Sequence, residues 1–270
     1  MTADPGPLTF AGDIAVNQHL LDRGFDVQLA MGSDVPDDGS TANGRDLIIQ
    51  SSSLGSGTVE ISGVGKFRFL PIPAIFWEPS SLDAFAFQAA NGGSTVGETA
   101  VNIVDPSHQL AAGFSKGLVT VTTAPETQGF GQGTPVGAHV VATLANDPSQ
   151  AVIAYYDKSE KGFDNFVMPA RRVFFYFLDN TAAISNDNGW KLFDAAVDWS
   201  LGVQAPAPPA AQPVLSVTRA GNALTISWTN GGKLQSATSL SSPITWADET
   251  GSSPVTVTPS GATKFYRVRQ

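Results

Sequence analysis

Short apolar runs recur along the first two hundred residues and alternate with helix-like stretches. Their length and their content of β-branched and aromatic residues are typical of buried strands. The runs are FDVQLA (25–30), DLIIQ (46–50), IPAIFWE (72–78), AVNIVD (100–105), LVTVTT (118–123), HVVATLA (139–145), AVIAYYD (151–157) and RRVFFYFL (171–178). Because near-continuous apolar strands are typical of a sheet covered on both faces, the pattern predicts a mainly parallel sheet.

Two longer stretches have the spacing of amphipathic helices. The first is predicted to run from a cap at Asp13 to about Arg23, with Gly24 as its left-handed end. The second covers 188–202 and closes the domain. Its apolar stripe consists of Trp190, Phe193, Val197 and Leu201. Strands in alternation with helices predict a flavodoxin-like three-layer α/β domain.

A proline-rich stretch divides the chain. Residues 203–212 lie within GVQAPAPPAAQPVLS (202–216), where prolines among alanines form a stiff, extended spacer. Six short alternating runs then follow within 213–270, separated by turn residues, as in a small all-β sandwich. We therefore expect an α/β domain over 1–202, a linker over 203–212 and a β-sandwich over 213–270.

Composition narrows the classes of function. Charged residues make up 14% of the chain and hydrophobic ones 42%, which is typical of a compact globular protein. The net charge is −9 and no basic run interleaves with aromatics, so we expect no binding to nucleic acid. No stretch approaches 18 consecutive apolar residues, so we expect no membrane span.

The motif search excludes several kinds of site. The chain has no cysteine, which rules out disulfides, thiolate nucleophiles, zinc–thiolate sites and iron–sulfur clusters. It also lacks a Walker A loop, an EF-hand pattern, an H-E-x-x-H motif and a G-x-S-x-G elbow. We therefore expect no cofactor and no metal.

One apolar run ends on a carboxylate. In IPAIFWEPSS the run stops at Glu78, which Pro79 follows. In an open parallel sheet the carboxyl ends of the strands line the ligand crevice, so Glu78 is expected there, beside Asp179 of a neighbouring strand end. Glu78 is either a general acid/base or ligand-binding group paired with Asp179, or a structural acceptor of backbone N–H groups from the next helical turn. We favour the structural interpretation, in which the helix N-terminus lowers the pKa of Glu78.

Further polar and aromatic side chains are candidates for ligand binding near this edge. Ser51, Ser52, Asp105 and His108 belong to loops expected on the same rim or close to it. Trp77 would supply apolar surroundings for Glu78. His108, after Asp105-Pro106-Ser107, is also interpreted as a hydrogen-bonded loop histidine.

Four segments carry a resemblance to a known fold. They are DRGFDV, DLIIQSSS, DPSHQLAAGF (105–114) and RRVFFYFLDN. With the order of elements, they make residues 1–202 resemble the class I glutamine amidotransferase-like fold, most closely its ThuA-like relatives. On that register Glu78 stands at the nucleophile position, and Asn180 stands where the strand bearing the catalytic histidine ends. Amidotransferase chemistry needs a thiolate and an imidazole in contact, so the resemblance implies a domain without that activity.

The same resemblance implies a central strand that runs into ADPGPLTFAGD. Met1-Thr2-Ala3 leave almost no residues for it. We therefore expect a truncated first strand, or a place in the sheet filled by another segment or another chain.

The C-terminal part carries a second resemblance. LTISW, KLQSATSLSSPITWADET and the terminal KFYRVR resemble the small fibronectin-like or immunoglobulin-like modules that end many secreted proteins of Verrucomicrobia-type bacteria. This implies a modular bacterial protein that is extracellular or at the cell surface. No signal peptide is recognisable in this chain.

Two hypotheses of function follow. The first is a non-catalytic or vestigial amidotransferase-like module of an exported protein, with a role in binding or assembly and a glycan or another cell-surface component as partner. The alternative is a hydrolase, with a glycan as the expected substrate, that uses Glu78 and Asp179 as its carboxylate pair. In that case the two carboxyl groups would lie roughly 5–10 Å apart.

Overall fold

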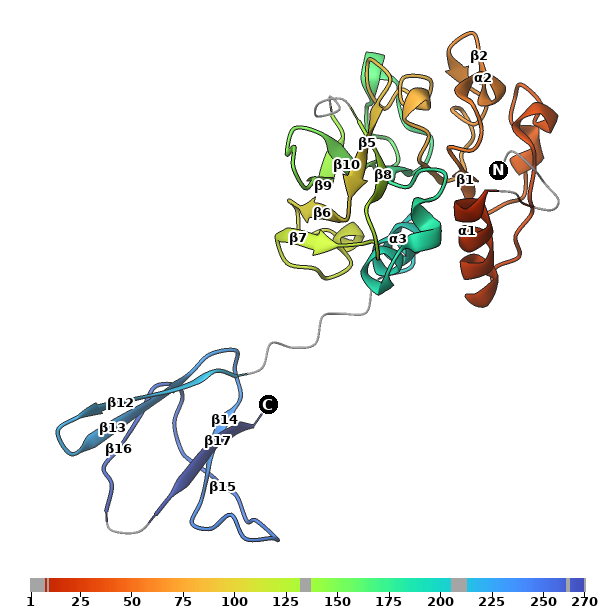
Figure 1. Ribbon diagram of the computed structural model, residues 1–270. Coiled ribbons are helices and arrows are strands. Elements are labelled where there is room, and N and C mark those ends of the chain that lie inside the picture. Colours follow the sequence, from red (N-terminus) through yellow and green to blue (C-terminus); the bar gives the residue numbers. More distant parts are fainter. Residues whose placement is uncertain (1–7, 9, 132–136, 205–212, 261–262, 270) are drawn as a thin grey trace. The chain divides into compact units, whose positions relative to one another are not determined.

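The computed structural model describes residues 8, 10–131, 137–204, 213–260 and 263–269 (Figure 1). The chain divides into two compact units, Met1–Ala205 and Pro206–Gln270. The predicted linker falls at this division, with its residues 205–212 outside the described part. The expected truncated first strand, over residues 1–6, also lies outside the described residues.

Seven strands in the described part of the first unit form one mixed sheet (Figure 1). Their order is β1 (Ile48–Gln50), β4 (Ala74–Phe76), β11 (Arg172–Phe174), β10 (Ala151–Tyr156), β9 (His139–Leu144), β6 (Ala100–Ile103) and β7 (Gly117–Thr120). β1, β4 and β11 are parallel, whereas each pairing from β11 to β7 is antiparallel. The expected parallel arrangement is therefore found in the β1–β4–β11 part of the sheet only.

Connection length explains one of the antiparallel pairings, that of β9 with β10. Only residues 145–150 separate β9 from β10, and a parallel crossover needs a dozen or more residues. The strands nevertheless read as continuous apolar runs, because both faces of the sheet are covered. An apolar run therefore indicates burial on two sides and leaves the direction of the strand undefined.

The two faces of the sheet are covered differently. On one face Ile75 and Val173 pack into the cluster that contains the buried side chains of both long helices. On the other face Phe76 and Phe174 pack against side chains such as Phe85, which come from loops and short helical turns. The second outer layer therefore consists of irregular segments in place of the helices that a three-layer domain would have.

Helix α1 (Ala11–Asp22) ends at the predicted glycine (Figure 1). Gly24 has φ +86°, and its N–H donates to the carbonyl of Leu21 over 2.9 Å. The N–H of Phe25 donates to the carbonyl of Leu20 over 3.1 Å. These two bonds form a Schellman motif, which a left-handed residue at this position permits.

Helix α3 (Asp187–Ser200) begins where Asn186 caps it with two backbone N–H bonds to its side-chain oxygen. Phe193 and Val197 of the predicted stripe are fully buried, and the other two stripe residues pack against the same cluster. Among the described residues, no helix is long and apolar enough to cross a membrane, in agreement with the sequence prediction.

Smaller elements connect the main strands. They are α2 (Ser56–Val59), the paired strands β2 (Glu60–Ile61) and β3 (Val64–Gly65), and the paired strands β5 (Gly93–Glu98) and β8 (Glu126–Phe130). The 3₁₀ helices are η1 (Gly32–Asp34), η2 (Ser40–Ala42), η3 (Pro79–Ser81), η4 (Gln109–Ala111), η5 (Phe163–Asn165) and η6 (Thr181–Ile184). The sequence pattern missed β5 and β8, since both are glycine-containing and largely polar.

The second unit contains two three-stranded antiparallel sheets. One consists of β12 (Leu215–Ala220), β13 (Ala223–Trp228) and β16 (Val255–Val257), and the other of β15 (Ala247–Asp248), β14 (Lys233–Ala237) and β17 (Phe265–Arg269). Each of the six predicted runs contains one of these strands. Ile226 and Trp228 of one sheet share a small core with Leu234 of the other, as in a sandwich.

Candidate functional site

Three parallel strands end at one edge of the main sheet. β1, β4 and β11 run in the same direction, so their carboxyl ends lie side by side. Ser51 follows β1, Glu78 follows β4, and Asp179 lies on the segment that continues from β11. Ser52 joins two of these ends, because its hydroxyl donates to Oδ1 of Asp179 over 2.8 Å. We call the following six residues the carboxylate rim: Asp13, Ser51, Ser52, Ser53, Glu78 and Asp179.

Asp13 is the most buried acid of the rim, with 4% of its surface exposed. The hydroxyls of Ser51 and Ser53 donate to its two carboxylate oxygens, each over 2.5 Å. The prediction that Asp13 caps α1 is wrong: the cap residue is Phe10, and Asp13 lies inside the first turn. Burial raises the pKa of Asp13 despite the two hydroxyl bonds, and the negative charge of Asp179 acts in the same direction.

The first turn of α1 touches the rim through a glycine. The N–H of Gly12 donates to the main-chain carbonyl of Asp179 over 3.0 Å. A Cβ at Gly12 would lie 2.4 Å from that carbonyl oxygen, so no larger residue fits without a shift of the backbone. Gly12 is therefore what allows α1 to approach the end of the β11 segment, and no sequence motif marked it.

Glu78 makes the bond that the structural interpretation requires. Its Oε1 accepts the N–H of Ser80 over 2.8 Å, so it caps the short helix η3 that begins at Pro79. Its pKa is nevertheless raised, and the prediction of a lowered pKa is wrong. Burial outweighs the bonds to Ser80, and the charge of Asp179 adds to the effect. A single turn of 3₁₀ helix supplies one well-placed N–H, whereas the lowered pKa assumed the dipole of a full helix.

Glu60 is a further acid near this edge that the sequence interpretation left out. It belongs to β2, within the glycine-rich stretch GSGTVEISGVG (55–65). Burial raises the pKa of Glu60, and the charges of Asp83 and Glu78 raise it further. The charge of Glu78 therefore acts on the pKa of Glu60, as that of Asp179 acts on the pKa of Glu78.

Two other predicted site residues, Trp77 and Asn180, lie next to rim residues in the sequence. Trp77 is 3% exposed, and its ring packs edge-on against Phe177 and Phe193 at 5.7 and 6.2 Å between centroids. It is mainly a core residue. Asn180 is exposed, and its main-chain carbonyl accepts the N–H of Ala183 at the start of η6.

Asp105 and His108 lie at the opposite edge of the sheet. They follow β6. Since β11, β10, β9 and β6 alternate in direction, β6 runs opposite to β11 and to its parallel partners β1 and β4, so its carboxyl end lies at the other side of the sheet. His108 stacks on Tyr155 at 4.1 Å and accepts the N–H of Leu110, as predicted for a loop histidine. Burial lowers its pKa. The expectation that these two residues share a rim with Glu78 is wrong, because it assumed a parallel β6.

The rim offers carboxyl groups and hydroxyls as its reactive groups. Ser51 and Ser53 donate to a carboxylate, and a serine without a matched base such as an imidazole is a weak nucleophile. In the described part of the chain, no three acidic or imidazole side chains lie where they could hold a metal ion together. Neither a protein-family model nor a curated protein matches the sequence. The chemistry of the rim is therefore inferred from its own geometry.

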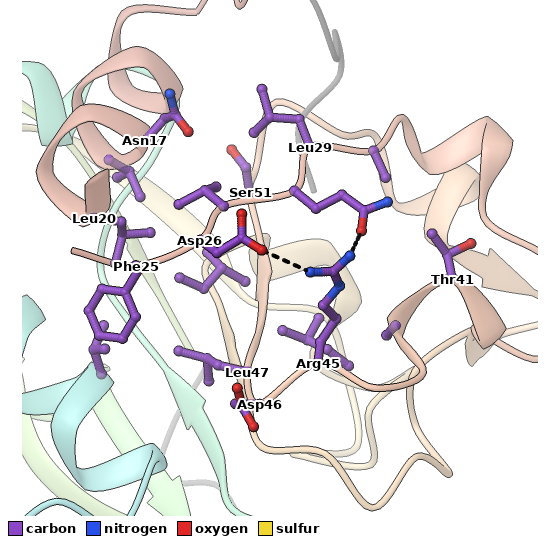
Figure 2. A pocket seen from close by; sticks show the side chains of 18 of the residues that line it. Asn17, Leu20, Phe25, Asp26, Leu29, Thr41, Arg45, Asp46, Leu47 and Ser51 are labelled. Atoms are coloured by element: carbon purple, nitrogen blue, oxygen red, sulfur yellow. Dashed lines mark hydrogen bonds and ion pairs between the residues drawn. The ribbon is translucent and has the colours of Figure 1, made fainter. Parts of the chain in front are cut away.

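A cavity of about 470 Å³ opens beside the rim (Figure 2). Asp13 and Ser51 lie in its wall, and so do residues 25–30 and 44–49. Figure 2 shows Arg45 reaching across from one of these segments to the other: it pairs with Asp26 at 3.5 Å and donates to the side chain of Gln28. The remaining wall is largely apolar and includes Phe25, Val27, Leu29, Leu47 and Ile49.

Proposed function

We propose that residues 1–202 form a non-catalytic, vestigial amidotransferase-like module of an exported modular protein, with a role in binding or assembly. The absence of a thiol and of an imidazole among the described rim residues carries this proposal. All three histidines of the chain are among the described residues, and each is engaged elsewhere: His19 with Asp194 at 2.7 Å, His139 with Glu160 at 2.8 Å, and His108 at the opposite edge. With no cysteine in the chain, the rim lacks both partners of the amidotransferase reaction.

The finer assignments belong to the same proposal. The parallel strands β1, β4 and β11 with two helices on one face support a variant of the flavodoxin-like, ThuA-like fold. The two small antiparallel sheets support a fibronectin-like or immunoglobulin-like second domain. We propose an extracellular or cell-surface location on the strength of that modular resemblance. A glycan or cell-surface component is the proposed partner, and the net charge of −9 disfavours nucleic acid.

One observation favours the alternative, a glycan hydrolase. The raised pKa of Glu78 is what an acid that protonates a leaving group requires, and Asp179 is a second carboxyl group close enough to act on it. Against it, Oε1 of Glu78 is bonded to the N–H of Ser80, and Glu78 is not among the residues that line the 470 Å³ cavity. We therefore retain the non-catalytic role.

Glycan binding with recovery of the ligand tests the proposal. Immobilised glycans are incubated with the protein, and the retained glycans are eluted and weighed by mass spectrometry. The proposal predicts that any retained glycan is recovered intact and that Glu78→Gln leaves retention unchanged. Recovery of cleaved glycans with the parent, but not with Glu78→Gln, would establish the hydrolase.

A further inference from the structure

Residues 25–30 have the properties of a strand that lacks its partner. Their exposure alternates, with Asp26 and Gln28 exposed and Phe25, Val27 and Leu29 half-buried. The predicted strand does not form here, since the segment belongs to no sheet. Phe25 donates its N–H to the end of α1, but among the described residues no main-chain hydrogen bond is made by residues 26–30.

This segment continues the layer of the main sheet. Val27 packs against the same helix-side core cluster as Leu47 and Ile49, as side chains of one sheet would. β1 is the end strand of that sheet within the described residues. Figure 2 shows that the side chain of Arg45 spans from its own segment to Asp26, so the two segments are joined across the cavity by side chains and not by a β-ladder.

We propose that the 470 Å³ cavity is a strand-accepting groove, in which an extended segment of another polypeptide chain pairs with the main chain of residues 26–30. This rests on the proposed binding role and specifies a polypeptide among the cell-surface components proposed as partner. The N–H and C=O groups of residues 26–30 follow one another along an extended segment. Extended chain rises about 3.3 Å per residue, which is also the rise of a second strand that would pair with them. Strand addition of this kind derives its affinity from main-chain hydrogen bonds and its specificity from alternate side chains in pockets.

The chemistry of the groove defines the partner more closely. Its apolar wall accepts β-branched or aromatic side chains at every second position. Among the described residues of its wall, three carry a carboxyl group (Asp13, Asp26 and Asp46) and one is a cation (Arg45), so basic residues beside the apolar positions are favoured. Residues 1–9 of this chain contain Asp4 and no lysine or arginine, so they lack the basic residues that the groove favours, and we assign the strand to another chain.

The test uses acetylated, amidated heptapeptides of the pattern Lys-x-Thr-x-Thr-x-Lys, with valine, leucine or phenylalanine at x. Binding to the full chain is measured by calorimetry at up to about 1 mM peptide, where weak sites fill. Hydrogen exchange of residues 26–30 is followed with and without peptide. The controls are two peptides N-methylated at alternate residues, each lacking the donors of one edge.

We expect fast exchange of residues 26–30 in the protein alone and a slowing of about tenfold or more on peptide binding, because pairing protects these amides. One N-methylated control should lose binding. Asp26→Lys should weaken binding at least about threefold, since it places a cation at the groove. Asp37→Lys makes the same charge change at an exposed residue outside the cavity wall and should leave binding unchanged.

Three results would overturn the inference. Slow exchange of residues 26–30 without peptide would mean that the chain already fills the groove itself. Equal binding of both N-methylated peptides would indicate an apolar ligand pocket. No binding by any of the peptides would exclude strand addition. None of these results affects the outcome of the glycan recovery assay. That assay tests the proposed function, whereas the peptide experiment tests the groove, so either proposal can be disproved without the other.

Discussion

At the scale of single residues, Glu78 caps a helical turn in an environment that disfavours its ionised form. The N–H of Ser80 is bonded to its carboxylate, yet burial and Asp179 raise its pKa. The sequence predicts the acid at the strand end and its bond to the following turn. Its pKa could not be predicted, because burial depends on which distant segments, such as the one that carries Asp179, fold against the strand end.

Replacing Glu78 separates the bond from the charge. Glu78→Gln keeps an acceptor for Ser80 and removes a buried charge, so we expect the free energy of unfolding at neutral pH to change by less than about 1 kcal/mol. Glu78→Ala loses the cap and should cost about 1 kcal/mol. Urea unfolding of both variants measures this. A loss with Gln as large as with Ala would mean that the ionised carboxylate itself stabilises the rim.

The raised pKa values of Glu78 and Asp13 also determine a pH dependence. A raised folded pKa means that the folded state binds the proton more tightly than the unfolded chain. The free energy of unfolding therefore rises as the pH falls through the folded pKa toward the unfolded value. The free energy of unfolding of the parent minus that of Glu78→Gln should increase as the pH falls from 7 toward 4.5, measured by urea unfolding at each pH. A decrease in this difference on acidification would contradict the raised pKa.

At the scale of elements, the sequence predicts which runs become strands far better than it predicts their direction. The apolar runs look alike whether they contain the parallel strands β1, β4 and β11 or the antiparallel strands β9 and β10. The reason is that all of these strands are buried on both faces. The antiparallel direction of β6, which its apolar run does not reveal, places His108 at the opposite side of the sheet from Glu78. Residues 25–30 failed as a strand although their local pattern is correct, since a strand exists only through a partner.

The contact between α1 and the rim gives an element-scale prediction. Gly12→Ala would place Cβ 2.4 Å from the carbonyl oxygen of Asp179, so the helix or the β11 segment must move. We expect a loss of about 1–3 kcal/mol in the free energy of unfolding, as for other overpacked sites. Gly57→Ala, within α2 and with open space around it, should be neutral or stabilise by up to about 1 kcal/mol. Equal effects of the two substitutions in thermal unfolding would disprove the close contact.

At the scale of the whole molecule, composition and the proline-rich stretch predict two units, and the chain divides between Ala205 and Pro206. Each unit has a core of its own. Chains ending at Gly202 or starting at Pro213 should therefore each unfold cooperatively. Calorimetry of the two pieces tests this, and the absence of a cooperative transition in both would place the boundary elsewhere.

The central claim is that the carboxylate rim has a structural role and does not catalyse turnover. Its most direct test is the rate of glycan hydrolysis by the parent protein, by the double variant Glu78→Gln/Asp179→Asn and by buffer alone, measured over pH 4 to 8 on a panel of glycans. We predict equal rates for all three at every pH. Hydrolysis by the parent well above buffer, and its loss in the folded double variant, would contradict the claim and make the two acids catalytic residues.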